Sequence, residues 1–153
     1  MITQRTALML VFIVSLLTII GAFVFQWAGY APCELCLMQR WAYYAVIPLS
    51  LIFAGIARSN AGIARWGLLL IALILVANSI FGIYHAGAEW KFWPGPDTCG
   101  GALSDGLPTL TNDPVVRCDE AAIRILGLSL AGWNAVICAA LAAIAFKGAS
   151  RKF

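Results

Sequence analysis

Two cysteines separated by two residues, Cys33 and Cys36, have the clearest chemical potential in this sequence. Such a pair can form an easily reduced disulfide, or it can hold a metal ion through two thiolates. Arg40 comes four residues after Cys36 and seven after Cys33, so on a helix all three lie on one face. Pro32 suits the first turn of that helix, where its missing N–H is not needed. The stretch predicts a helix start, whose dipole favours thiolates.

The elements that must position this pair are apolar. Of the 153 residues, 62% are hydrophobic and 11% are charged, which is too little polar surface for a soluble domain of this size. We expect helices over about residues 7–27, 36–57, 66–85 and 123–146, each long enough to cross a hydrocarbon core. The outer loops then cover about residues 28–35 and 86–122. The sequence predicts an all-α membrane protein, in which residues 1–153 form a single integral membrane domain, a bundle of four transmembrane helices.

The charges are distributed by side of the membrane. Four crossings place both termini on one side, which receives six of the 10 basic residues and none of the seven acidic ones. These basic residues are Arg5, Arg58, Arg65, Lys147, Arg151 and Lys152. Because Lys and Arg favour the cytoplasmic side, the N- and C-termini are predicted to be cytoplasmic. With charges sorted in this way, the net charge of +3 gives no indication of nucleic-acid binding.

This topology places Cys33, Cys36, Cys99 and Cys118 on the outer side. In an oxidising compartment the natural pairing is two disulfides, Cys33–Cys36 and Cys99–Cys118. The first closes almost no loop and would be a poor staple, which favours redox chemistry, whereas the second could be a staple. Four thiolates could instead hold zinc or copper, although the second pair lacks the short spacing typical of such sites. Cys138 lies within the last apolar run and is expected to be a small buried residue.

Two further residues suit an electron acceptor near the thiols. Arg40 just inside the interface is costly, so it should be paired or functional, either reaching lipid headgroups or facing a negatively charged reduced quinone. His85 is the only histidine and lies at the outer end of the third apolar run. It could donate a hydrogen bond or proton to a quinone oxygen, or it could cap the helix.

The sequence resembles the DsbB family of bacterial disulfide-bond-formation membrane proteins. The resemblance covers nearly the whole chain and rests on the Pro-Cys-x-x-Cys motif followed by Gln39-Arg40, on four apolar runs and on two further cysteines in the second outer loop. It also includes three further stretches, which are Trp93–Cys99, Arg117–Glu120 and Leu126–Asn134.

The resemblance implies a quinone-dependent oxidoreductase of the bacterial inner membrane that reoxidises a periplasmic, DsbA-like thioredoxin-fold thiol oxidase. Both outer loops are then periplasmic. The reduced partner is expected to attack Cys99 of the Cys99–Cys118 disulfide, and Cys118 then exchanges with Cys33, so that electrons reach the Cys33–Cys36 pair.

In the same resemblance, Cys36, Arg40 and His85 are the expected contacts of ubiquinone or menaquinone drawn from the membrane quinone pool. No bound metal is expected. The sequence leaves two alternatives open. One is a thiolate metal-binding or metal-handling membrane protein, and the other is a disulfide-stapled membrane scaffold without chemistry.

Overall fold

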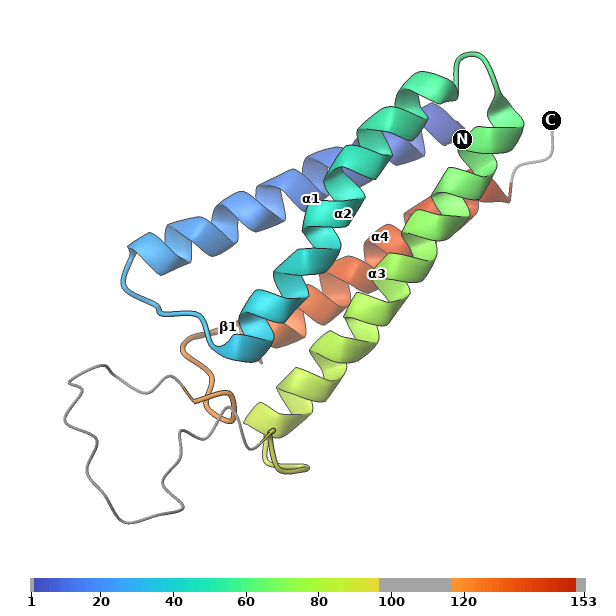
Figure 1. Cartoon of the computed structure of the whole chain (residues 1–153). Coiled ribbons are helices and arrows are strands. Elements are labelled where there is room, and N and C mark those ends of the chain that lie inside the picture. The colour runs from blue at the N-terminus through green and yellow to red at the C-terminus, as the bar shows by residue number, and fades with distance from the viewer. Residues whose placement is uncertain (1, 97–116, 151–153) are drawn as a thin grey trace, which may run out of the picture.

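The computed structural model describes residues 2–96 and 117–150, which form a bundle of four long helices (Figure 1). The helices are α1 (Gln4–Trp27), α2 (Glu34–Ile56), α3 (Ala61–Glu89) and α4 (Leu130–Ala149). Each is long and apolar enough to cross a membrane. Large apolar side chains such as Leu17, Leu73 and Ile80 are mostly exposed, as expected for surfaces that face lipid. The predicted bundle of four transmembrane helices is confirmed, and the chain is a multi-pass membrane protein.

Each helix begins at a side chain that accepts a backbone N–H from its first turn. Thr3, Cys33, Asn60 and Ser129 are these N-caps. A side-chain acceptor satisfies one of the N–H groups that a helix start leaves without a partner. The Asn60 cap starts α3 earlier than the predicted residue 66, and α3 also continues past His85 to Glu89. The second outer connection therefore starts later than the predicted residue 86.

The start of α4 also differs from the prediction. Residues near 123 were expected to be helical, but β1 (Arg124–Ile125) and β2 (Leu128–Ser129) form an antiparallel hairpin instead. Leu126 and Gly127 connect them with φ angles of 53° and 85°, the positive values that a two-residue hairpin turn of type I′ requires. Helix α4 cannot continue backward through two such residues, so it begins at Leu130.

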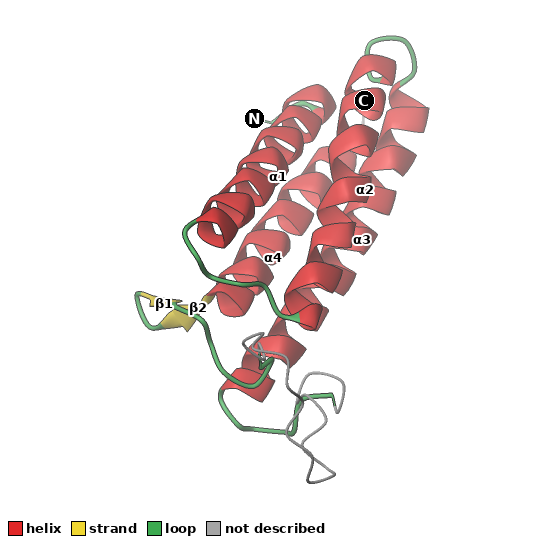
Figure 2. Cartoon of the chain, turned by 60° about the vertical axis from the view of Figure 1, so that its left-hand side comes forward, coloured by secondary structure: helices red, strands yellow, loops and turns green. Residues whose placement is uncertain are grey.

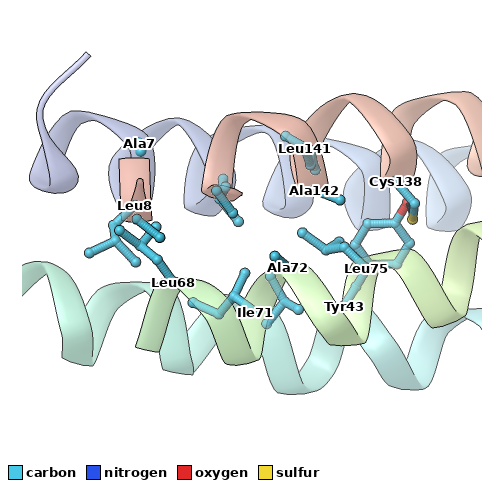
Figure 3. Close-up of a cluster of buried hydrophobic side chains, with 14 of the residues drawn as sticks. Ala7, Leu8, Tyr43, Leu68, Ile71, Ala72, Leu75, Cys138, Leu141 and Ala142 are labelled. Carbon is cyan, nitrogen blue, oxygen red and sulfur yellow. Dashed lines mark hydrogen bonds between the residues drawn. The ribbon is translucent and has the colours of Figure 1, made fainter. Parts of the chain in front are cut away.

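The helices pack through small residues and a shared apolar core. On α3, Gly82 lies so close to α4 that an added Cβ would be 3.1 Å from Ala135 N. Ser79 Oγ donates to the Ala135 carbonyl at 2.8 Å. Such small residues and interhelical hydrogen bonds are typical of helix pairs in membranes. Figure 3 shows the core between the helices, where Leu68, Ile71 and other apolar side chains meet.

The two ends of the bundle differ. The start of α1, the α2–α3 connection and the end of α4 lie together at one end (Figures 1 and 2). The α1–α2 connection, the start of α2, the end of α3 and the β-hairpin lie at the other end. Because Cys33 caps α2, we call this second end the thiol end.

Candidate functional site

The two cysteines of the Cys-x-x-Cys motif lie where α2 begins. Cys33 is the N-cap, and its Sγ accepts the backbone N–H of Cys36 at 3.3 Å. The two Sγ atoms are 2.7 Å apart, and both cysteines are free. The sulfurs are close enough for a bond to form by side-chain rotation, since a disulfide needs about 2.05 Å. The Cys33–Cys36 disulfide itself stays a prediction.

His85 on α3 connects this pair to two further buried side chains. It is 1% exposed, and its Nε2 lies 3.5 Å from Cys33 Sγ and 3.8 Å from Glu89 Oε1. Its Nδ1 lies 3.0 Å from Gln39 Nε2. Because an amide nitrogen can only donate, Nδ1 must accept, and in the neutral ring Nε2 then carries the hydrogen. The imidazole N–H is thus directed to the sulfur and the carboxylate.

These contacts lower the pKa of the Cys33 thiol below its ordinary value. The hydrogen bond from the Cys36 side chain is the largest cause, and the His85 hydrogen bond and charge act in the same direction. Burial of Cys33 acts in the opposite direction, because it disfavours the charged form. Cys33, which lies just before the first residue of α2, is therefore well placed to carry negative charge.

Alkylation of reduced Cys33 is expected to continue at pH values below the ordinary thiol range. A group with a lowered pKa stays ionised above that pKa, so the alkylation rate falls only when the pH drops through it. His85→Phe removes one hydrogen bond to the thiolate and should raise the midpoint of the pH–rate profile by about one unit. Mass spectrometry of the Cys33 peptide measures this midpoint.

His85→Gln keeps a donor at this position and should restore part of the shift, while Ser59→Ala at the opposite end of the bundle is the matched control. A midpoint that His85→Phe leaves unchanged would show that the imidazole does not stabilise the Cys33 thiolate.

Beside the thiols, a cavity of about 390 Å³ opens between α1, α2, α4 and the hairpin. Its size is that of a small-molecule pocket, and its walls are mainly apolar. The lining residues are Thr18, Ile19, Gly21, Ala22, Phe25, Tyr30, Ala31, Pro32, Cys36, Gln39, Arg40, Tyr43, Ala122, Ile125, Leu130, Ala131, Trp133, Asn134 and Ile137. Cys36 and Arg40 line it, whereas Cys33 and His85 do not. The two sulfurs thus have different surroundings.

Arg40 is the charged side chain in this lining. It is 9% exposed, its Nη1 donates to Gln26 Oε1 at 2.8 Å, and its guanidinium lies 5.1 Å from the centre of the Phe23 ring. Within residues 2–96 and 117–150, no carboxylate forms an ion pair with it. A buried cation with only neutral neighbours is costly, and it makes the cavity attractive to an anion or a partial negative charge.

Cys118 lies beside the cysteine pair and is not part of the cavity lining. It is fully buried, clusters with Cys33 and Leu35, and is disulfide-bonded. Its predicted partner, Cys99, lies outside the described residues, so the Cys99–Cys118 pairing stays a prediction.

The neighbouring Asp119 fixes the position of the Cys118 segment. Its carboxylate accepts two hydrogen bonds of 2.9 Å from Arg117 and another from Lys91, which follows α3. The Arg117 and Lys91 charges and hydrogen bonds lower the pKa of Asp119, so this ion pair persists at neutral pH. The segment is thereby tied to the end of α3 that carries His85.

The structure brings Cys33, Cys36, Arg40, His85 and Cys118 together at the thiol end. His85 lies against the Cys33 sulfur and does not line the cavity. The contact of His85 with a quinone would require a position in the cavity lining, and it stays a prediction.

Three side chains that were not assigned to the site from the sequence also belong to it, namely Gln39, Glu89 and Asn134. The i,i+4 spacing of His85 and Glu89 was a usable signal. Asn134 ends one of the stretches that carry the family resemblance, but neither its spacing nor a motif assigned it to the site.

Comparison with known proteins identifies the family of the chain. The family model for disulfide bond formation protein DsbB matches residues 4–147. Disulfide bond formation protein B of Pseudomonas syringae pv. tomato is 34% identical over 141 residues, covering 85% of this chain and 80% of that protein. Disulfide bond formation protein B 1 of Pseudomonas entomophila is 33% identical over 144 residues, covering 87% and 82%.

An uncharacterized protein of Rickettsia prowazekii is 25% identical over 133 residues, covering 81% of this chain and 75% of that protein. No solved structure matches. The match to the family model extends over all four helices and both ends of the bundle. The chain therefore belongs to the DsbB family of disulfide bond formation proteins.

Proposed function

We propose that this protein is a quinone-dependent protein-disulfide oxidoreductase, which reoxidises a periplasmic thioredoxin-fold thiol oxidase of the DsbA type. The observation that carries the proposal is the different environment of the two sulfurs. Cys33 clusters with the disulfide-bonded Cys118, while Cys36 lines an apolar cavity that also contains Arg40. A dithiol placed in this way can receive electrons from Cys118 and release them into the cavity.

The thiol exchanges are those that the family resemblance implies, and the placement of Cys33, Cys36 and Cys118 supports them. A thiolate of the reduced partner attacks Cys99 of the Cys99–Cys118 disulfide and releases Cys118, whose thiolate attacks Cys33 and releases Cys36. The second partner thiol then frees Cys99, which attacks Cys118, restores the first disulfide and releases Cys33. The partner has lost two electrons and two protons, and the Cys33–Cys36 pair has gained them. The lowered pKa of Cys33 makes it a good leaving group in the last exchange.

The cavity fits a quinone headgroup. It has the volume of a small-ligand site, its walls are mainly apolar, and two polar groups in it have few partners, the Arg40 guanidinium and a buried amide nitrogen of Asn134. Ubiquinone or menaquinone supplies an acceptor of two electrons and two protons. Cys36 and Arg40 would hold its ring, and the buried His85 would keep the Cys33 thiolate ready while Gln39 holds the imidazole. The walls of α1 and α4 exclude water.

The proposed location is the bacterial inner membrane with the thiol end facing the periplasm. The opposite end carries the described basic residues Arg5, Arg58, Arg65 and Lys147, which favour the cytoplasm. A reporter that is active only in the cytoplasm should therefore be active when it is fused to the C-terminus. Activity of a periplasm-dependent reporter at the same position would reverse the proposed orientation.

Purified protein with a reduced thioredoxin-fold partner and a quinone tests the function. We expect the partner to lose two thiols for each quinone reduced, and parallel assays with ubiquinone and menaquinone identify the acceptor. Acid quenching followed by thiol counting gives the state of the four redox cysteines. Disulfides that do not exchange with the partner would refute the proposal and favour the inert scaffold.

A second candidate function is metal binding, because the ligand atoms of Cys33, Cys36 and His85 all lie within 4.8 Å of one another. Two sulfurs and an imidazole are typical zinc ligands. Stoichiometric zinc that survives purification and protects the thiols, together with a lack of quinone reduction, would favour this candidate over the oxidoreductase.

A further inference from the structure

A network of polar side chains lies in the core, next to the cavity. The Tyr43 hydroxyl donates to Asn134 Oδ1 at 2.6 Å and lies 3.1 Å from Cys138 Sγ. Figure 3 shows Tyr43 directed at Cys138 among the apolar core residues. Asn78 Nδ2 donates to the same sulfur at 3.3 Å. Cys138 is buried, as expected, but it is also a junction between three polar residues from α2, α3 and α4.

This network fixes the orientation of the Asn134 amide. Both Tyr43 and Cys138 donate to Oδ1, the sulfur from 3.7 Å. Because Oδ1 receives these donors, Nδ2 must lie on the other edge of the amide group. Tyr43 and Cys138 are themselves buried, and Asn78 supports Cys138 from α3. The network therefore holds the Asn134 side chain in one position.

Within the described part of the chain, the nitrogen of this amide has no hydrogen-bond partner. Asn134 is 8% exposed, and its Nδ2 is buried without an acceptor among the described residues. An unsatisfied buried donor is unusual in native proteins and costs free energy. Asn134 is also part of the cavity lining, together with Tyr43. An oxygen atom of a molecule in the cavity would supply the missing acceptor.

We propose that Asn134 Nδ2 donates a hydrogen bond to a carbonyl oxygen of the quinone ring. The inference rests on the proposed function and adds a specific binding residue on α4. Arg40 and Cys36 approach the cavity from α2, so a donor on α4 would orient the ring between two walls. Cys138 acts as a positioning residue, because it does not line the cavity and reaches the ring only through Asn134, while Tyr43 lines the cavity and also holds the Asn134 oxygen.

Two variants of Asn134 and one matched control test the inference. Asn134→Leu removes the donor, and Asn134→Asp keeps the acceptor for Tyr43 but replaces the donor nitrogen with oxygen. Ser50→Ala removes a buried hydroxyl on α2 that donates to the Val46 carbonyl and lies outside both the network and the cavity lining. The probe is a short-chain ubiquinone, whose binding to oxidised protein without partner is followed by quenching of tryptophan fluorescence. Trp133 lies in the cavity lining, and a tail lacking the quinone ring controls for partition into detergent.

We expect both Asn134 variants to weaken ubiquinone binding and raise its KM about tenfold, with an unchanged KM for the thiol partner. Ser50→Ala should stay within about twofold of the parent protein. Unchanged binding in both Asn134 variants would overturn the inference, and so would an equal loss in Ser50→Ala, which would mean that the loss of any buried polar group in the bundle has this effect. If the parent protein neither binds nor reduces a quinone, the proposed function fails as well, and this separates the two failures.

Discussion

Replacing Cys36 with serine is expected to abolish oxidation of the thiol partner and to leave Cys33 joined to Cys118. Without Cys36, Cys33 cannot form its own disulfide. It lies in one cluster with Cys118, which is disulfide-bonded, and the His85 hydrogen bond and charge, which also lower the pKa of Cys33 and favour the attacking thiolate, do not depend on Cys36. Attack of the Cys33 thiolate on Cys118 forms a new bridge and releases Cys99 as a thiol. No electrons leave the protein, so this exchange needs no quinone.

The measurement is non-reducing peptide mass spectrometry after acid quenching, together with turnover of the reduced partner. Cys33→Ser should abolish turnover equally but show no bridge to Cys118. Cys138→Ser is the matched cysteine control for bridging, because this thiol is buried in the core away from the pair, and it should leave the bridges of Cys33 and Cys118 unchanged. Quinone reduction that continues in Cys36→Ser would contradict the proposed electron route.

Sequence reasoning predicted the helices better than their ends. Hydrophobic run length located all four spans, because crossing a hydrocarbon core constrains length and composition together. The start of α4 was missed, because the hairpin depends on positive φ at Leu126, a residue that favours helix by propensity. The longer α3 depends on the Asn60 cap and on tertiary support for its last turn, where Gly87 packs against Trp93.

In the site, too, spacing along one helix was predictable from the sequence, whereas contacts between helices were not. The spacing of Cys33, Cys36 and Arg40 predicted one helical face, and Cys36 and Arg40 do share the cavity wall. Cys33 is displaced from that wall because it caps the helix and lies next to His85. The position of His85 depends on how α3 packs against α2, which periodicity does not specify. The same holds for Asn134, whose free amide nitrogen is defined only by neighbours on other helices.

Arg40→Met is the second substitution with a large expected effect, since it should raise the KM for quinone by about 10- to 100-fold while the KM for the thiol partner stays unchanged. A hydrogen bond to a charged group contributes about 1.5–3 kcal/mol, which corresponds to this range. The side chain is buried in the cavity wall and held by Gln26 and Phe23, and among the described residues it has no acidic partner. Its charge is therefore available to a ligand oxygen, and steady-state kinetics with each substrate varied in turn measures the two constants.

Two companion variants separate charge from packing. Arg40→Lys keeps the charge but loses the planar guanidinium that bonds to Gln26 and lies over Phe23, so it should restore only part of the quinone affinity. Gln26→Leu leaves the charge and removes one contact that positions it, so its effect should have the same sign and be smaller. If Arg40→Met changed the KM for quinone and the KM for the thiol partner equally, the arginine would have a structural role in the bundle. A group that acts only through the cavity must change the KM of the substrate that binds there and leave the other KM unchanged.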